Sequence, residues 1–185
     1  MNIQKALTFI AFGFLFTLLN ININSINFTP SFIGWILLFL AYDNLGTYTE
    51  GKVWLKWTSL ALGVLSFVIW IFGLTKPEFS TRVLDAVLSA ASAVYLYFLL
   101  GILENVADDY GSGLSRKLHT VKLVNLVAVC LMELIAIQIP AQGTPDTLIA
   151  VLVFALMLLA LGLAIYMMFL LFRLRKDIKQ LAYAK

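Results

Sequence analysis

The feature that most constrains this chain is its division into six apolar segments with few charged side chains. The segments cover residues 5–24, 30–43, 54–74, 82–104, 118–139 and 147–172, and the last contains no charged residue. A helix of about 20 apolar residues crosses the hydrocarbon core of a bilayer. Because backbone polar groups must pair within the chain in hydrocarbon, each segment is predicted to be a helix. The expected fold class is therefore all-α, a polytopic membrane protein forming one domain over residues 1–185 with six transmembrane helices.

The overall composition favours the same class of protein. Of the 185 residues, 62% are hydrophobic and 12% are charged, whereas soluble domains average about 45–50% apolar and about 25% charged residues. This excludes a cytosolic enzyme, a disordered segment and a nucleic-acid-binding protein. The expected surroundings are the lipid bilayer. Cys130 is the single cysteine, so the chain forms no internal disulfide.

The lysines and arginines predict the orientation of the chain. If six spans alternate in direction, one side of the membrane carries eleven cations: Lys5, Lys52, Lys56, Arg116, Lys117, Lys122, Arg173, Arg175, Lys176, Lys179 and Lys185. The other side carries only Lys76 and Arg82. Because cytoplasmic loops are enriched in Lys and Arg, both termini are expected to be cytoplasmic.

The second segment is too short to cross a bilayer unaided. Thr29-Pro30 is predicted to cap it, with the proline at the first helical position. A helix over residues 31–43 is about 20 Å long, against a hydrocarbon core of about 30 Å. Two alternatives remain open at this stage. Either the bilayer thins, or the helix starts below the outer surface and residues 20–29 form non-helical backbone that protein or a wet cavity must surround.

One carboxylate is predicted to lie well inside a span. Glu133 falls about 9 Å from the outer end of the fifth helix, and Asn125 is two turns away on the same broad face. An ionisable residue at this depth is a functional candidate. In the functional interpretation, Glu133 serves a proton- or cation-coupled site or anchors a ligand. In the structural interpretation, it is a glutamate that is protonated or is paired with Lys76, Arg82 or an asparagine.

The outer ends of the first, second and fifth helices are predicted to form an uncharged, hydrogen-bonding recess. Phe28, Phe32 and Trp35 are expected to cap it, and Gln138, Gln142 and Thr144 to contribute to it. Such a recess suits a neutral or zwitterionic small molecule. In the alternative interpretation, the asparagines only cap helix ends and bond one another. The candidate ligand-binding residues are Asn20, Asn24, Asn27, Trp35, Asn125 and Glu133.

Other polar groups carry weaker signals. Glu104, Asp108 and Asp109 cluster at the cytoplasmic end of the fourth helix, where they either hold a divalent cation or form a solvated helix end neutralised by Arg116 and Lys117. His119 is expected to be a surface residue with no partner at metal-ligand spacing. Ser59, Gly63, Ser66 and Gly73 form a small-residue stripe that favours close helix packing. No hydrolytic or metal-binding motif is present, so no catalytic residue, metal or cofactor is predicted.

The stretch Ile26–Leu45, with its Pro-Ser-Phe-Ile-Gly-Trp sequence, resembles a segment of small polytopic membrane proteins of Gram-positive bacteria that have no assigned activity. This resemblance implies a bacterial cytoplasmic membrane protein. Size and span number are also similar to the substrate-binding S-components of energy-coupling-factor vitamin transporters, which bind solute at the outer face. That family has two alanines four residues apart in its first helix. Here Ala6 and Ala11 are five apart, so the similarity is one of architecture.

The sequence leaves three classes of function open. The first is a protein that binds or transports a small solute in an outer-face recess. The second is a membrane interaction, assembly or immunity-type protein that docks a membrane-protein partner through its last helix and basic tail. The third is a lipid-modifying enzyme. The third would need Glu133 and the Glu104–Asp108 pair in one cleft, although the segments place them near opposite membrane faces.

Overall fold

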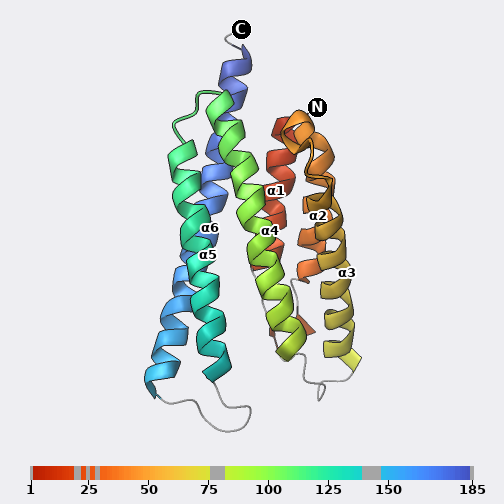
Figure 1. The fold of residues 1–185 in the computed structure, drawn as a ribbon, viewed down its shortest axis with the longest axis vertical. Helices are drawn as coiled ribbons and strands as arrows, with labels where there is room; N and C mark the ends of the chain where they lie inside the picture. Colours follow the sequence, from red (N-terminus) through yellow and green to blue (C-terminus); the bar gives the residue numbers. More distant parts are fainter. Residues whose placement is uncertain are drawn as a thin grey trace.

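The computed structural model of the chain describes residues 2–18, 22–23, 26–27, 30–75, 82–138 and 147–183. Six helices make up the fold (Figure 1): α1 (Ile3–Leu18), α2 (Ser31–Leu45), α3 (Val53–Thr75), α4 (Arg82–Asp109), α5 (Ser115–Gln138) and α6 (Thr147–Tyr183). A short 3-10 helix, η1 (Gly46–Thr49), joins α2 to α3. Between α1 and α2, β1 (Asn22–Ile23) pairs antiparallel with β2 (Ile26–Asn27). The predictions of an all-α fold and of six helices are confirmed.

Four of these helices are long and apolar enough to cross a membrane. The apolar stretches are Val53–Phe72, Leu84–Asp109, Ser115–Ile135 and Thr147–Leu181, and Ile3–Thr17 is a shorter apolar helix. These lengths and compositions are those of a multi-pass integral membrane protein.

The helices form a ring in chain order. Each helix packs against the next one, and α6 packs against α1 to close the ring. The first turn of α1, η1, the α4–α5 connection and the last turn of α6 lie at one end of the bundle, called here the upper end (Figure 1). Most of the cations that were predicted to be cytoplasmic lie on the parts of the helices nearest this end.

The ring is tightly packed only in its upper half. The core contains residues 95–107 of α4, 114–121 of α5 and 167–178 of α6, together with α1 and α2. Toward the lower end, α5 and α6 expose large apolar side chains, including Val127, Leu134, Leu148 and Phe154. Only 6% of the most apolar stretch of α6 is buried inside the protein. The rest of the protein thus leaves most of this apolar helix uncovered, as expected for a helix surrounded by lipid.

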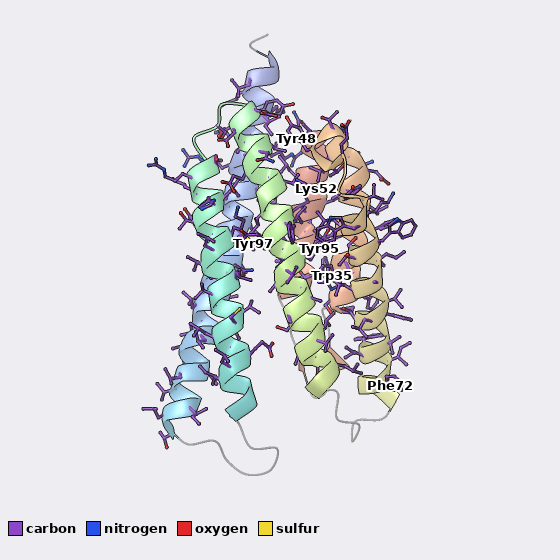
Figure 2. The ribbon with its side chains drawn as sticks, in the orientation of Figure 1. Trp35, Tyr48, Lys52, Phe72, Tyr95 and Tyr97 are labelled. Atoms are coloured by element: carbon purple, nitrogen blue, oxygen red, sulfur yellow. The ribbon has the colours of Figure 1, made fainter. Side chains whose placement is uncertain are left out.

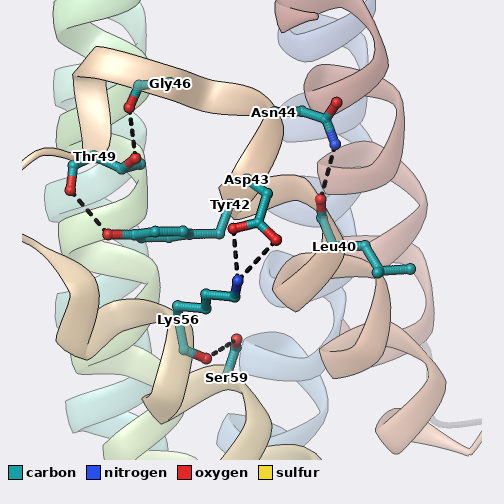
Figure 3. A network of polar contacts seen from close by, with 8 residues as sticks. All are labelled: Leu40, Tyr42, Asp43, Asn44, Gly46, Thr49, Lys56 and Ser59. Carbon is teal, nitrogen blue, oxygen red and sulfur yellow. Dashed lines mark hydrogen bonds and ion pairs between the residues drawn. The ribbon is translucent and has the colours of Figure 1, made fainter. Parts of the chain in front are cut away.

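Polar contacts at the upper end fix the connection between α2 and α3 (Figure 3). The Tyr42 hydroxyl donates to the Thr49 carbonyl at 2.8 Å, and the Thr49 hydroxyl donates to the Gly46 carbonyl at 2.7 Å. Lys56 of α3 bonds both carboxylate oxygens of Asp43 at 2.6 and 2.8 Å. Gly46 has a φ of 62°, a left-handed conformation that suits glycine and ends α2 here.

Helices α1 and α2 are both short, and they cross closely. A Cβ atom on Gly34 would lie 2.5 Å from the Gly13 carbonyl oxygen and 2.9 Å from the Thr17 backbone nitrogen. The two glycines therefore let the helix backbones touch. The predicted shortness of the second helix is confirmed, since its 15 residues span about 22 Å.

Several predicted helix ends were wrong. The first helix ends at Leu18 rather than at residue 24, because asparagines that alternate with isoleucines favour extended backbone, which β1 adopts. Pro30 itself occupies the N-cap position of α2, and the helix begins at Ser31. Helices α4 and α6 continue to Asp109 and Tyr183, beyond the predicted apolar segments. Outside hydrocarbon, charged residues such as Lys and Arg remain good helix formers.

Candidate functional site

A polar pocket lies among α1, α2, α4 and α5, just below the packed core. Its volume is about 320 Å³, which is within the range of small-molecule sites. The polar residues that line it are Thr17, Ser31, Asp85, Ser89, Ser92 and Asn125, and Trp35 and aliphatic side chains complete the wall. We call it the interhelical pocket. Ser89 and Ser92 lie within the apolar stretch Leu84–Asp109, so the pocket reaches into the membrane-spanning part of the bundle.

Asn125 is the most informative residue of the pocket. It is only 8% exposed, yet it lines the cavity. Among the residues that the structure describes, no side-chain or backbone group is hydrogen-bonded to its amide. Among the described residues, Ser66 Oγ is the only side-chain polar atom that is fully buried and unpartnered, so the Asn125 amide is reached through the cavity and can bond to its contents. The donor and acceptor of Asn125 are therefore available to a molecule in the pocket.

Trp35 forms a rigid wall of the pocket. Its ring is 2% exposed and makes an edge-to-face contact with Tyr95 of α4, with 5.2 Å between the ring centroids. Figure 2 shows the two side chains together in the middle of the bundle. On the far side, Trp35 packs on α3, where a Cβ atom on Gly63 would lie 3.2 Å from the Trp35 Cβ. Gly63, which belongs to the small-residue stripe of α3, therefore leaves room for the Trp35 side chain.

The hydroxyl groups of the pocket are anchored to their own helices. Thr17 donates to the Gly13 carbonyl at 3.0 Å, and Ser92 donates to the Leu88 carbonyl. Their oxygen lone pairs are left to accept hydrogen bonds from the cavity. Ser31 begins α2, and no side chain caps this helix end. The backbone N–H groups of its first turn are thus not satisfied by a capping side chain.

Asp85 is the site residue that reasoning from the sequence missed. It lies in the first turn of α4 and is the single ionisable side chain among the described residues that line the pocket. The partial positive charge of a helix N-terminus stabilises a carboxylate at this position. The signal that would have found it is its spacing from Ser89 and Ser92, because residues i, i+4 and i+7 share one helical face.

The structure brings together two of the six predicted site residues. Trp35 and Asn125 both line the interhelical pocket. Glu133 is half-buried and lies one helical turn beyond Val129, outside the pocket lining. The structure describes only the backbone of Asn27, in β2. Asn20 and Asn24 lie outside the described residues, so their part in a recess stays a prediction.

Phe32 does not close the recess as predicted. Its ring contacts those of Phe67 and Trp70 at centroid distances of 5.1 and 5.6 Å. It lines an apolar groove of about 470 Å³ between α2 and α3. Residues 32 and 35 are only about 60° apart around the helix axis, but Phe32 packs on the rings of α3 whereas Trp35 contacts Tyr95 of α4.

A second polar cluster ties α4 to α5 above the pocket. Glu104 accepts hydrogen bonds from Lys122 Nζ at 2.7 Å and lies 3.0 Å from His119 Nδ1. Lys122 also lies over the Tyr97 ring at 5.1 Å. His119 is half-exposed, as expected for a surface residue, and its contact with Glu104 was not predicted. The depth of Glu133 within a span stays a prediction.

The remaining acidic residues of the cluster have separate environments. Tyr48 of η1 is hydrogen-bonded to Asp109, and burial, together with this carboxylate, raises the pKa of Tyr48 to about 12. Asp108 is exposed. Glu104, Asp108 and Asp109 therefore do not converge, and no group of three or more metal-binding side chains occurs in the parts of the chain that the structure describes.

Comparison with known proteins adds no further constraint, since no family model, no curated protein and no solved structure matches the chain.

Proposed function

We propose that the protein binds or transports a small solute at the bacterial cytoplasmic membrane, and that the interhelical pocket holds this solute. The observation that carries the proposal is the amide of Asn125, which is 8% exposed, lines a cavity of about 320 Å³ and has no hydrogen-bond partner within the described part of the chain. Buried polar groups in a membrane protein that face a cavity are typical of substrate pathways.

The proposed orientation places the pocket toward the outer face. The helix ends at the upper end of the bundle carry Lys5 of α1, Lys52 before α3, Arg116 and Lys117 of α5, and Lys176 and Lys179 of α6. An excess of Lys and Arg is typical of the cytoplasmic side. The pocket lies below the packed core, on the side away from these cations, so a solute would reach it from outside.

A second candidate function has one observation in its favour. The first half of α6 exposes apolar side chains on all sides, with Leu148 69% and Val151 63% exposed. A membrane-protein partner that docks on this helix is the alternative to lipid. A lipid-modifying enzyme is less favoured, because it would need Glu104 and Glu133 in one cleft. Glu104 is paired with Lys122, and Lys122 lies about 16 Å from Glu133 along α5.

A solute screen on the purified full-length protein tests the proposal. Vitamins, amino acids and nucleosides are added separately, and the thermal unfolding midpoint is measured in detergent. A solute at 100 times its Kd is expected to add about 2.7 kcal/mol to the free energy of unfolding. Asn125→Leu should weaken this stabilisation, because it removes both hydrogen-bonding groups. Asn105→Leu, at an exposed position of α4, is the matched control and should leave it unchanged.

Two outcomes would reject the proposal. One is the absence of stabilisation by any solute class, and the other is equal stabilisation of the wild-type protein and the Asn125→Leu variant. Stoichiometric co-purification of a membrane protein, together with the first of these outcomes, would favour the interaction function instead.

A further inference from the structure

An open pocket lies on the outer face of α6, at the point where this helix changes from apolar to basic. Its volume is about 510 Å³, and the described residues that line it are Phe169, Phe172, Arg173, Lys176, Asp177 and Gln180. Positions 169, 173, 176 and 180 are three or four residues apart, so they share one helical face. This face points away from the core, which Leu171, Leu174 and Ile178 of the same helix join. We call it the basic pocket.

The basic pocket lies at the level of a membrane surface. Residues 147–172 contain no charged side chain, and they cover about 38 Å, more than the hydrocarbon core of about 30 Å. One turn further, Asp177 accepts a hydrogen bond at 2.8 Å from the hydroxyl of Ser112, which lies in the α4–α5 connection at the upper end of the bundle. The two phenylalanines of the pocket therefore face acyl chains, and its two cations face lipid headgroups.

The cations of this part of α6 have no anionic partner among the described residues. The helix contains Arg173, Arg175, Lys176 and Lys179 but only one acid, Asp177. The ion pairs that described residues form are made by other cations. The single acid already accepts a hydrogen bond across to the α4–α5 connection. The pocket therefore keeps an uncompensated positive charge directly beside an apolar surface.

An anionic phospholipid is complementary to both parts of this surface. The Arg173 guanidinium has the planar donor geometry that binds a phosphate through two hydrogen bonds, and the Lys176 ammonium adds a second positive charge. The exposed rings of Phe169 and Phe172 offer an apolar surface to the acyl chains below. A zwitterionic phospholipid gains less, because its own ammonium group meets the same cations.

We propose that the basic pocket binds the headgroup of an anionic phospholipid, with the acyl chains lying along the lower, apolar part of the same helix face. Clusters of Lys and Arg next to the end of a membrane helix are typical of anionic-lipid binding. The site is separate from the interhelical pocket, and the proposal goes beyond the proposed function and does not depend on it.

The experiment compares two phospholipids on the full-length protein in detergent. Phosphatidylglycerol and phosphatidylcholine with the same acyl chains are titrated separately, and native mass spectrometry gives the apparent affinity of each. Phosphatidylglycerol should bind about thirtyfold more tightly, the equivalent of about 1 kcal/mol for each of two cations. Higher ionic strength should reduce this preference, because salt screens exposed charges.

Two double variants remove the same charge from different faces of α6. Arg173→Gln with Lys176→Gln should lower the affinity for phosphatidylglycerol to that for phosphatidylcholine. Arg175→Gln with Lys179→Gln is the matched control, because these cations are also exposed but do not line the pocket. The control should retain most of the preference. The salt titration of the wild-type protein provides a second test if the first double variant does not fold.

Free sn-glycerol 1-phosphate tests whether the acyl chains are needed. It carries the phosphate without the apolar part, so it should not displace phosphatidylglycerol from the protein. Displacement at similar concentrations would show an anion site rather than a lipid site.

Three further results would overturn the proposal. The first is equal affinity of the wild-type protein for the two lipids. The second is an equal loss of preference in the two double variants, which would assign binding to net charge alone. The third is a preference that salt leaves unchanged. None of these results bears on the interhelical pocket, whose solute is tested separately.

Discussion

At the scale of single residues, the chain keeps a largely buried charged pair between two apolar helices, α4 and α5. The side chains of Lys122 and Glu104 are only 10% and 21% exposed, and their atoms lie 2.7 Å apart. Removing two charges from water costs several kcal/mol per ion, which only good geometry and further hydrogen bonds repay. His119 supplies a further contact to Glu104, and the Tyr97 ring lies under the ammonium group. The pair therefore holds α4 and α5 together directly above the pocket.

Lys122→Met tests how strongly this pair holds the two helices. The variant leaves Glu104 without its main counter-charge, so the free energy of unfolding in detergent should fall by about 3 kcal/mol. Glu104→Gln combined with Lys122→Met should be less harmful than Lys122→Met alone, because no unpaired charge remains. Lys56→Met, at the more exposed pair with Asp43, is the control and should cost under about 1 kcal/mol. Equal losses for the two single variants would contradict this account.

This pair shows where prediction from the sequence stops. Glu104, His119 and Lys122 are all visible as polar residues in apolar surroundings. Which of them meet depends on the register of α4 against α5, and that register is set by the turn at residues 110–114 and by side-chain packing. Asp85 was missed for a related reason. Its spacing from Ser89 and Ser92 marks a polar face of α4, but whether that face lines a cavity depends on how α2 and α5 pack beside it.

At the scale of helices, the α1–α2 pair is the most unusual part of the fold. The shortness of α2 was predictable, because Pro30 marks its start. The early end of α1 was not. Residues 20–24 alternate three asparagines with two isoleucines. The isoleucines extend the apolar segment, yet they favour extended backbone, and asparagine is a weak helix former. The crossing of the pair depends on Gly13 and Gly34, where a side chain would meet the backbone of the other helix.

Gly34→Ala tests this crossing. The new Cβ would lie 2.5 Å from the Gly13 carbonyl oxygen, so the helices must separate, and the free energy of unfolding should fall by about 1–3 kcal/mol. Gly162→Ala in α6 is the matched control, because a Cβ atom there would have no other atom within 4 Å. An exposed helical Gly→Ala change is expected to be neutral or to stabilise by up to about 1 kcal/mol. The idea fails if both variants unfold at the wild-type temperature.

At the scale of the whole molecule, the six helices could be predicted because helix number depends on a simple average, the length of each apolar segment. The orientation inferred from counting Lys and Arg stays a prediction. The division into a packed upper half and an open lower half could not be predicted in this way. It arises because α1 and α2 are short, so the lower parts of α5 and α6 lack the neighbours that fill the ring above.

Cysteine labelling in cells tests the proposed orientation. In a Cys130→Ala background, Glu50→Cys and Gly113→Cys should react with a membrane-impermeant maleimide only after the cytoplasmic side has been exposed. Gly143→Cys should react in intact cells, because it joins the end of α5 to the start of α6, and both lie at the lower end of the bundle (Figure 1). The reverse pattern would place the cations outside and would reject the orientation.

The length of α2 also has an electrical consequence for the proposed route. Under this proposal, water and solute fill the space below Ser31, so a membrane voltage would fall mainly across the distance covered by α2, about 22 Å rather than about 30 Å. The local field would then be steeper than elsewhere in the membrane. A charged solute bound at Ser31 would have crossed only a small part of the membrane voltage. Its further movement from Ser31 to the cytoplasm would cross nearly all of the voltage, which is worth about 2.3 kcal/mol per charge per 100 mV.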